Sequence, residues 1–542
     1  MAMPTTTIRT TTTRFALCGP ESGSAGFTLA AVYGAYRACR RRKRGTRNAQ
    51  RYEVGLLDHL VNTAQALSGR VWRPSRAVAF VVRRPKTREI LAADFSDRVV
   101  HHLLVPRLER QFEPVFIHDC FSNRVGKGTH AAVNRLQTFM QRAKEQAKKT
   151  QQRVHYLQLD IANFFNSINR RQLFELVRGR LERDGRRPAT DARHLGVADA
   201  DELLWLTRRV LTGNAAAGAV LRGTAAEFAH VPAHKRLINA PPEIGLPIGN
   251  LTSQFFANVY LNELDQFVKH TLKCTYYVRY VDDMVLLHPD PAVLLGWRDQ
   301  IAQFLAQRLG LRLRDAGRLR PVADGVDFLG YVQRSDYRLV RRRVVANLHE
   351  KLSHYERQIK GRVPQTWRLQ ANAQPLFCML ASYLGHFHHA SSHQLVASLW
   401  QRYPWLTWLV RLGADGRLLP TQSARGVSAM RGQWRYFRKL FANTCVLMQV
   451  GKQVELYGAD ARCVAQWPGH GGRPVLRPGW SADEAGLAWS LARLDCLLQR
   501  LTQQGLAWVY VAEQGWLKSG ALKQRALRRL YWPAQRSLAQ SE

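Results

Sequence analysis

One stretch near the middle of the chain constrains its fold more than any other. Residues 275–288 read Thr-Tyr-Tyr-Val-Arg-Tyr-Val-Asp-Asp-Met-Val-Leu-Leu-His. Apolar and β-branched residues flank an acidic pair, which predicts two short strands joined by a tight turn at Asp282 and Asp283. Adjacent carboxylates at such a turn repel each other unless a cation lies beside them. An ordinary Asp-rich turn is the alternative. A metal site is indicated only if another segment supplies further ligands beside this turn.

A second acidic position lies more than a hundred residues upstream. Residues 156–168 read Tyr-Leu-Gln-Leu-Asp-Ile-Ala-Asn-Phe-Phe-Asn-Ser-Ile, which predicts a buried strand that ends at Asp160. Carboxylates at neighbouring strand ends can bind Mg²⁺ ions that bridge to phosphates, with the backbone carbonyl near Ile161 as a further ligand. One of Phe164 and Phe165 is expected to pack in the core. The other ring would lie under the sugar of a bound nucleotide and exclude a 2′-hydroxyl group. Phe165, five residues after Asp160, is the residue placed for this role.

The order of elements joins the two acidic segments. The pattern predicts a strand at Asp160, helices, the acidic hairpin, a helix over 292–309, and strands at 311–314 and 326–332. This β-α-β-β-α-β order brings Asp160 and Asp282 to one face of a sheet. We therefore predict an α+β fold of the right-hand polymerase type, with fingers, palm and helical thumb, and a small C-terminal α/β domain.

Basic and glycine-rich segments accompany this core. The hairpin predicted over 77–91 carries Lys86 and Arg88 at its bend, where cations can reach a triphosphate. The loop 119–130 contains Arg124, Lys127 and Gly128 and suits a phosphate of template or nucleotide. A Gly-x-Pro-x-Gly turn then leads through 248–254 into a helix.

These segments resemble reverse transcriptases in their order over about residues 50–400. The resemblance implies that Asp160, Asp282 and Asp283 are catalytic, and that these residues and Ile161 bind two Mg²⁺ ions, or Mn²⁺. It implies further contacts with nucleotide and with template or primer. The nucleotide contacts are Lys86, Arg88, Phe165, Ile248, Gly249 and Gln254, and the template and primer contacts are Arg124, Lys127, Gly128, Ser253, Tyr280, Phe328 and Gly330.

The pocket motif narrows the resemblance. Most bacterial reverse transcriptases carry Gln-Gly-x-x-x-Ser-Pro, whereas residues 248–254 read Ile-Gly-Asn-Leu-Thr-Ser-Gln. With residues 124–130 and 382–386, this form is similar to reverse transcriptases of diversity-generating retroelements. Those enzymes copy a template RNA with errors opposite adenine, and a small basic accessory protein assists them. Relatives carry a Lys after position 313 that could protonate pyrophosphate; this chain has Arg314 and Arg318, and Arg is a poor proton donor.

The C-terminal part resembles another family. Residues 445–461 and 485–514 alternate between strand and helix patterns in the way of the mismatch-recognition domain of MutS. There a Phe-x-Glu pair contacts mispaired DNA; here Gln453 replaces the Phe and Glu455 remains. The resemblance implies DNA contact by Gln453 and Glu455 without stacking on a mismatch. An accessory domain with no mismatch role is the alternative.

Composition limits the partners. Eighty Lys and Arg residues stand against 40 Asp and Glu, a formal charge of +40, which favours a nucleic-acid partner. No apolar run is long enough for a membrane span, and no signal peptide is recognisable. The eight cysteines form no Cys-x-x-Cys pair, so neither zinc nor a disulfide framework is indicated. We expect a bacterial cytoplasmic protein that binds template RNA, primer or cDNA, and dNTPs, without a membrane partner.

Seven parts of the chain follow from these patterns. They are a mobile tail (1–26), an N-terminal helix and fingers (27–150), a palm (151–335) with a fingers insertion at about 180–245, a thumb (336–412), a linker (413–429), the MutS-like domain (430–536) and a tail (537–542).

Two rival functions remain at this point. One is an antiphage-defence or group II intron-like reverse transcriptase, and the other is a catalytically silent nucleic-acid-binding scaffold.

Overall fold

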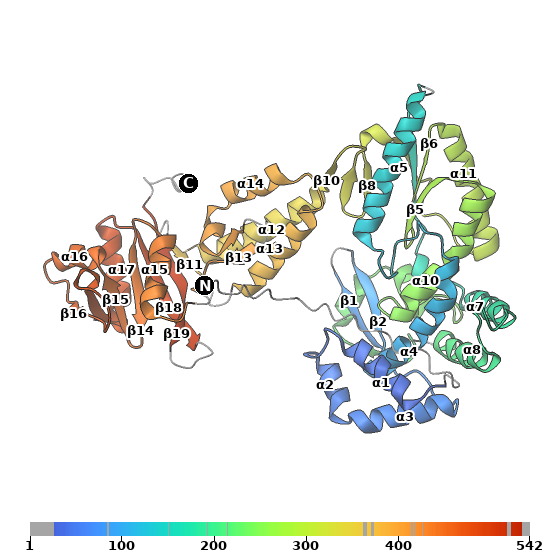
Figure 1. Cartoon of the computed structure of the whole chain (residues 1–542), viewed down its shortest axis with the longest axis horizontal. Helices are drawn as coiled ribbons and strands as arrows, with labels where there is room; N and C mark the ends of the chain where they lie inside the picture. The colour runs from blue at the N-terminus through green and yellow to red at the C-terminus, as the bar shows by residue number, and fades with distance from the viewer. Residues whose placement is uncertain are drawn as a thin grey trace, which may run out of the picture. The chain divides into compact units, whose positions relative to one another are not determined.

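The chain forms two compact units in a computed structural model (Figure 1). The first comprises residues 1–325 and the second residues 326–542. The structure describes residues 26–83, 86–149, 151–191, 193–213, 215–360, 366–369, 373–413, 416, 418–424, 427–516 and 522–533. The predicted tails therefore lie outside the described residues, apart from Gly26. The boundary after Gly325 falls ten residues before the predicted end of the palm.

A four-stranded antiparallel sheet organises the first unit. Its strands are β3 (His155–Leu159), β5 (Tyr276–Tyr280), β6 (Asp283–His288) and β7 (Arg318–Pro321), in the order β5-β6-β3-β7. The registers Leu159↔Met284 and Tyr280↔Asp283 set the end of β3 beside the β5–β6 turn. The predicted β-α-β-β-α-β arrangement is present. The strand expected at 311–314 is wrong, because those residues form only an isolated bridge at Leu313 and the strand lies at β7.

Helices surround this sheet. Helix α10 (Leu251–Gln266) is buried on nearly all sides, which its apolar composition predicts for a central helix. Helices α5 (Thr129–Lys149) and α11 (Pro291–Phe304) pack along β5 and along β3 and β6, and flank the strands in Figure 1. The other helices of the unit are α1 (Leu29–Arg40), α2 (Arg47–Val54), α3 (Leu56–Ser68), α4 (Phe95–Phe112), α6 (Phe164–Ser167), α7 (Arg170–Gly185), α8 (Val197–Thr212) and α9 (Ala225–Ala229).

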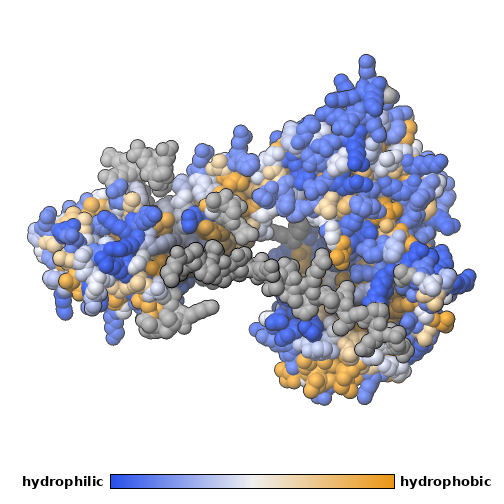
Figure 2. All heavy atoms as spheres, in the orientation of Figure 1, coloured by the Kyte–Doolittle hydropathy of each residue, from blue (hydrophilic) through white to orange (hydrophobic). Residues whose placement is uncertain are grey.

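The predicted basic hairpin is a second, smaller sheet. Strands β1 (Val78–Val82) and β2 (Arg88–Ala92) pair antiparallel, and β4 (Val220–Leu221) joins β1 in parallel. One continuous hydrophobic core runs from the N-terminal helices through α4 and α10 to the palm sheet. The N-terminal helices therefore belong to the same folded body as the acidic turn. Figure 2 shows hydrophobic residues gathered over α3, where Leu57 is 76% exposed.

The second unit begins with a small sheet and three long helices. Strands β8 (Val326–Phe328), β9 (Tyr331–Gln333) and β10 (Arg338–Val340) form an antiparallel meander. Helices α12 (Arg342–Ile359), α13 (Gln374–Phe387) and α14 (His393–Arg402) follow, in agreement with the helical thumb expected from the sequence.

A seven-stranded sheet completes the second unit. The strands are β11 (Thr366–Arg368), β14 (Cys445–Val450), β15 (Gln453–Tyr457), β16 (Arg473–Val475), β17 (Gly486–Ser490), β18 (Trp508–Trp516) and β19 (Lys523–Tyr531). Their order is β11-β19-β18-β14-β15-β17-β16, with β14 and β18 parallel and the other neighbours antiparallel. Helices α15 (Met430–Leu440), α16 (Ala459–Ala465) and α17 (Leu494–Gln503) accompany the sheet.

Two expectations about the second unit need correction. The C-terminal part is not separate from the thumb, because β11 of the thumb segment pairs with β19 and one hydrophobic core includes both parts. The linker expected at 413–429 contains strand β13 (Leu418–Pro420), which pairs with β12 (Val410–Leu412). Thr421 and Ala424 in that segment are buried. The α+β fold class is confirmed.

Candidate active site on the palm sheet

The structure brings Asp160 and Asp282 together. Asp160 follows the last residue of β3, and Asp282 lies in the turn between β5 and β6. Burial, charge repulsion from the neighbouring Asp160 carboxylate and a hydrogen bond between the two side chains together raise the pKa of Asp282 to about 7. The two carboxyl groups therefore lie close enough together that ionisation of both at once is disfavoured.

Asp283 begins β6 beside this pair. Its Oδ1 atom accepts a hydrogen bond from Nε2 of Gln158, at 3.4 Å. Asp283 is paired with Tyr280 across the ladder and so follows Asp282 directly at the start of β6. The turn thus offers one carboxylate to Asp160 and a second at its edge.

Arg314 is the cation next to the site. Its guanidinium forms an ion pair with Asp160, and its backbone N–H donates to the Asp160 carbonyl at 2.9 Å. The Arg314 side chain is 52% exposed, so this pair has access to solvent. Ile161 forms an isolated bridge with Leu313. The segment around Arg314 therefore extends the sheet edge past the two carboxylates.

A buried network holds the acidic turn in place. Val281 has a φ angle of +56°, an uncommon conformation for a β-branched residue. Its N–H donates to Oγ of Ser122 at 3.1 Å, and its carbonyl accepts from Nη1 of Arg279 at 2.9 Å. Arg279 is fully buried and paired with Asp265 of α10, which is also fully buried. Sequence reasoning missed this network, although an Arg inside an apolar strand signals a buried carboxylate partner.

The close carboxylate pair fits a divalent cation. Ionisation of Asp282 is disfavoured beside Asp160, which a bound cation would reverse, and Mg²⁺ commonly uses one or two protein carboxylates together with substrate phosphates. Among the described residues no group of three or more His, Cys, Asp or Glu side chains has the arrangement of a metal site. A two-carboxylate palm with phosphate ligands from a substrate is consistent with both observations.

The residues predicted to contact nucleotide lie on the β1–β2 hairpin, on α6 and in the pocket motif that leads into α10. Phe164 is buried in the core, and Phe165 is half-buried with its ring 5.4 Å from that of Phe164. The Phe165 carbonyl accepts from the N–H of Leu246, which ties the Asp160 segment to the pocket motif. Gly249 has a φ angle of +111°, which favours glycine, and a Cβ atom there would also approach the Ile90 side chain to 3.0 Å.

Side chains around that turn are only partly accessible. Ile248 and Gln254 are half-buried, whereas Ser253 is buried at the start of α10. Lys86 and Arg88 are exposed on the β1–β2 hairpin. The hairpin contacts the pocket motif directly, since Asn250 accepts the Ala93 N–H at 3.0 Å.

Arg124 does not fit the predicted contact with template. Its guanidinium donates to Glu113 and to the carbonyls of Ile117 and Cys120, and its side chain is 8% exposed. Arg124 therefore stabilises the loop 119–130 through buried hydrogen bonds. Lys127 donates to the His118 carbonyl at 2.8 Å.

Gly128 and Tyr280 lie at the start of α5 and the end of β5. Gly128 has a φ angle of +123°. Thr129 donates to the Tyr280 hydroxyl at 3.2 Å. The glycine loop therefore contacts the acidic hairpin, a closeness that the sequence did not predict.

The second unit carries the remaining predicted contacts. Phe328 is fully buried, and Gly330 has a φ angle of +94° beside His386, where a Cβ atom would approach the imidazole to 3.2 Å. Gln453 is exposed at the β14–β15 hairpin. Glu455 is fully buried and accepts from Arg477 and Tyr457, so its carboxylate does not fit the predicted contact with DNA.

Comparisons with known proteins give structural neighbours only. No described protein family matches the sequence, and no curated protein matches it. A solved structure of apo telomerase from Candida tropicalis, truncated from the C-terminal domain, is similar with a TM-score of 0.36 and 12% identity. That match covers 49% of this chain and 55% of the other.

Two further telomerase structures are similar at the same level. Telomerase from Candida albicans in complex with a TWJ fragment of telomeric RNA has a TM-score of 0.34 and 11% identity over 61% of this chain and 59% of that one. Apo telomerase from Candida tropicalis has a TM-score of 0.34 and 12% identity over 48% of each chain. The chain thus spans roughly half the length of the solved structures it matches.

None of the helices in the described part of this chain combines the length and apolar character needed to cross a membrane.

Proposed function

We propose that this protein is an RNA-directed DNA polymerase. The observation that carries the proposal is the close Asp160–Asp282 pair at one end of an antiparallel palm sheet. Template-directed polymerisation joins a primer 3′-hydroxyl to the α-phosphate of a nucleotide, with pyrophosphate as the leaving group. Catalysis of this kind depends on positioning and on stabilisation of phosphate charge rather than on a protein nucleophile.

The residues of this chain have distinct parts in the proposal. Asp160 and Asp282, with Asp283 and the carbonyl near Ile161, would hold two Mg²⁺ ions. When bound, these ions would neutralise charge on the phosphates and on the leaving oxygen. Phe165 would exclude a 2′-hydroxyl group, and the exposed Lys86 and Arg88 would bind the triphosphate.

The pocket motif supports a specific biological type. Ile248 replaces the usual Gln, and the side chain of Ile248 is half-buried beside the turn at Gly249. An aliphatic side chain there makes no hydrogen bond to a templating base pair, which suits frequent misincorporation. We infer a diversity-generating retroelement in a bacterial cytoplasm, with a template RNA and a small basic accessory protein as partners. The charge of +40 supports binding to RNA.

The catalytic part of the proposal has a direct test. Asp282→Ala with Asp283→Ala should abolish primer extension on an RNA template while leaving RNA affinity within about twofold, because neither carboxylate attracts RNA phosphates. Asp299→Ala, on the exposed face of α11, is the matched control and should retain activity. Extension that persists in the double variant would overturn the assignment. Loss of extension in the double variant, with activity retained in Asp299→Ala, would also exclude a catalytically silent scaffold.

The retroelement part needs a different measurement. cDNA made in cells with the intact locus should carry substitutions concentrated at template adenines. Faithful cDNA from the same cells would favour the defence or intron-like alternative while leaving the polymerase assignment intact.

A further inference from the structure

A groove on the exposed side of α1 is lined largely by arginine. Its volume is about 390 Å³, and the residues that line it are Gly34, Arg37, Ala38, Arg40, Arg41 and Arg44. A Cβ atom added at Gly34 would meet nothing within 4 Å, so the floor of the groove is open. Residues 37–52, which include this groove, contain eight Lys and Arg residues and no Asp or Glu. The groove therefore combines concentrated positive charge with room for a ligand.

Most of these arginines are available to a ligand. Arg40 is the exception, because it forms an ion pair with Glu53 of α2. The side chains of Arg37, Arg41 and Arg44 are exposed, and they form no hydrogen bond or ion pair with any residue that the structure describes. Three cations in one groove thus lack an internal partner, which is the condition under which a bound anion gains the most.

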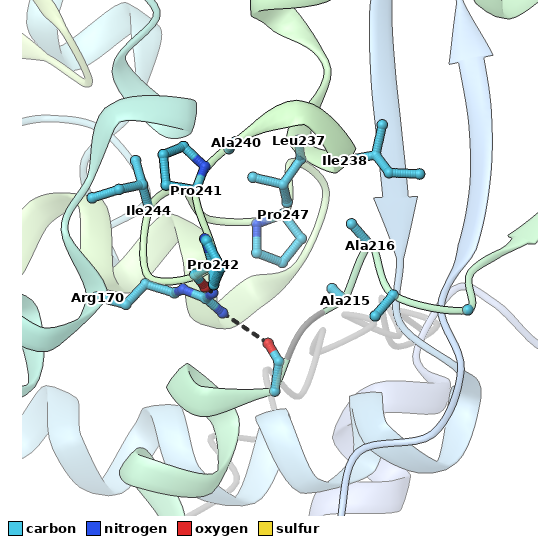
Figure 3. A pocket seen from close by; sticks show the side chains of 14 residues that line it. Arg170, Ala215, Ala216, Leu237, Ile238, Ala240, Pro241, Pro242, Ile244 and Pro247 are labelled. Carbon is cyan, nitrogen blue, oxygen red and sulfur yellow. Dashed lines mark hydrogen bonds between the residues drawn. The ribbon is translucent and has the colours of Figure 1, made fainter.

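An arginine beside a cavity is not always available in this chain. Arg170 lines the cavity of about 180 Å³ shown in Figure 3. Its guanidinium donates to the carbonyls of Leu211 and Gly213 at 2.9 Å each, and the bond to Gly213 is drawn in Figure 3. That arginine stabilises the fold, whereas the arginines of the α1 groove do not.

An exposed aromatic ring continues the groove along the same helix. Leu29, Tyr33, Arg37 and Arg41 follow one another at intervals of four residues, so they lie along one face of α1 at steps of about 6 Å. Leu29 is 48% exposed and Tyr33 is 46% exposed. This face of α1 therefore presents an apolar half with a ring and a basic half with the groove.

The combination of ring and arginines favours one class of ligand. Guanidinium groups match the geometry of phosphate oxygens. Proteins that bind unpaired nucleic acid combine a positively charged groove with aromatic rings on which bases stack. A duplex offers no free base face to Tyr33, and a carboxylate-rich peptide requires no ring, so neither uses both halves of this face.

The α1 face is separate from the candidate active site. Helix α1 packs on α4, and Figure 1 shows α1, α2 and α3 together at a distance from β5 and β6 within the first unit. None of the residues that line the groove belongs to the palm turn or to the pocket motif. A strand bound here is therefore not the segment being copied.

We propose that this face of α1 binds an unpaired segment of RNA, with phosphates at Arg37, Arg41 and Arg44 and one base stacked on Tyr33. The proposal rests on the proposed function only in naming RNA as the polyanion. The site holds a part of the RNA that is not being copied, and it keeps the RNA on the protein while another segment passes the palm.

The test measures binding of a short, fluorescently labelled oligouridylate to the full chain by anisotropy, over a range of salt concentrations and without nucleotide or Mg²⁺. The triple variant Arg37→Gln, Arg41→Gln, Arg44→Gln should bind about tenfold more weakly or worse at roughly 0.15 M salt. The plot of log affinity against log salt should become shallower by about 2, because each lost phosphate contact removes about 0.7 from the slope.

Two further variants test the stacked base. Tyr33→Leu should weaken binding by about fivefold or more, whereas Tyr33→Phe keeps the ring and should stay within about twofold of wild type. Asp282→Ala with Asp283→Ala should bind as tightly as wild type. A protein without polymerase activity can therefore still pass this test, and an active polymerase can fail it.

A charge-matched control separates the groove from net charge. It removes three exposed arginines in and just after α7, and should stay within about twofold of wild type because salt screens distant charges: Arg171→Gln, Arg183→Gln, Arg186→Gln. Thermal unfolding verifies that each variant is folded. An equal loss of affinity in this control, wild-type affinity in Tyr33→Leu, or equally tight binding of a duplex RNA would overturn the proposal. Displacement of the RNA by polyglutamate at equal charge concentration would also overturn it and indicate an acidic protein as the partner.

Discussion

The buried pair of Arg279 and Asp265 offers the sharpest test of how the acidic turn is held. Asp265 accepts from Nε of Arg279 at 2.7 Å, from its Nη2 at 2.6 Å, and from the Tyr277 hydroxyl at 2.9 Å. Both charged side chains are fully buried. Asp265 holds the pKa of Arg279 above its ordinary value despite the opposing effect of burial. The guanidinium also donates to the carbonyl of Val281, so one group links α10 to the turn.

Arg279→Met should destabilise the region strongly. The change leaves the Asp265 carboxylate buried without a cation, which costs about 3–5 kcal/mol. It also removes the hydrogen bond to Val281, a residue whose left-handed conformation costs about 1–3 kcal/mol and persists only while its surroundings enforce it. The double variant Arg279→Met with Asp265→Leu buries no charge. It should recover most of the lost stability, yet its turn still lacks the Val281 contact and primer extension should stay impaired.

Native-state hydrogen exchange at the β5 and β6 amides measures this effect locally. A local readout is preferable because the chain has two units, and one global transition does not describe both. Arg298→Met removes an Arg from a surface ion pair with Asp299 and should change the opening free energy by at most about 1 kcal/mol. An Arg279→Met effect no larger than this control, or a double variant less stable than both single variants, would refute the reasoning.

Three further predictions address other parts of the molecule. Arg314→Ala should lower the Mg²⁺ concentration that gives half-maximal primer extension, because Arg314 competes with cations for Asp160, while Arg320→Ala on the exposed edge of β7 should not. Burial lowers the folded pKa of His101 to about 3 from an ordinary value near 6.5, so its contribution to stability is complete above pH 6.5 and is lost as pH falls toward 3. The free energy of unfolding, measured in urea, should therefore fall by about 3 kcal/mol less for His101→Phe than for wild type between pH 7 and pH 4. Glu455→Gln should destabilise the second unit by about 1–3 kcal/mol, since it weakens a buried carboxylate's bonds, whereas exposed Gln453→Ala should stay within about 0.5 kcal/mol in the same unfolding measurement.

Local sequence patterns were sufficient for the palm. Short apolar runs lead into Asp160 and lie on both sides of the Asp282 turn, and a β-α-β-β-α-β order leaves few ways to arrange four strands, so the sheet and its close carboxylates could be predicted. The strand expected at 311–314 was misplaced by several residues. Its alternating Leu and Arg residues have strand periodicity, but Arg314 pairs with Asp160 and the ladder with β3 begins only at Arg318.

Long-range pairing explains what the sequence did not reveal. Strand β11 has only three residues and joins the C-terminal sheet across a segment that reads as a domain boundary. Arg124 and Glu455 look like surface charges in sequence, yet each has a buried partner that is unrecognisable without the fold. Burial of a charge depends on its partner rather than on its own residue type, and such partners lie at no fixed spacing.

The same principle determines which charges remain available at the candidate active site. Arg279 lies only three positions before Asp282, close enough to neutralise it, but Asp265 already satisfies that guanidinium in the interior. Arg279 is therefore not available to neutralise the turn, and the pKa of Asp282 stays raised beside Asp160. Arg314, the cation that does contact Asp160, is half exposed, and an exposed ion pair contributes at most about 1 kcal/mol. A divalent cation can therefore displace Arg314 readily, whereas it could not displace a buried partner, so the two arginines together leave the carboxylate pair open to metal.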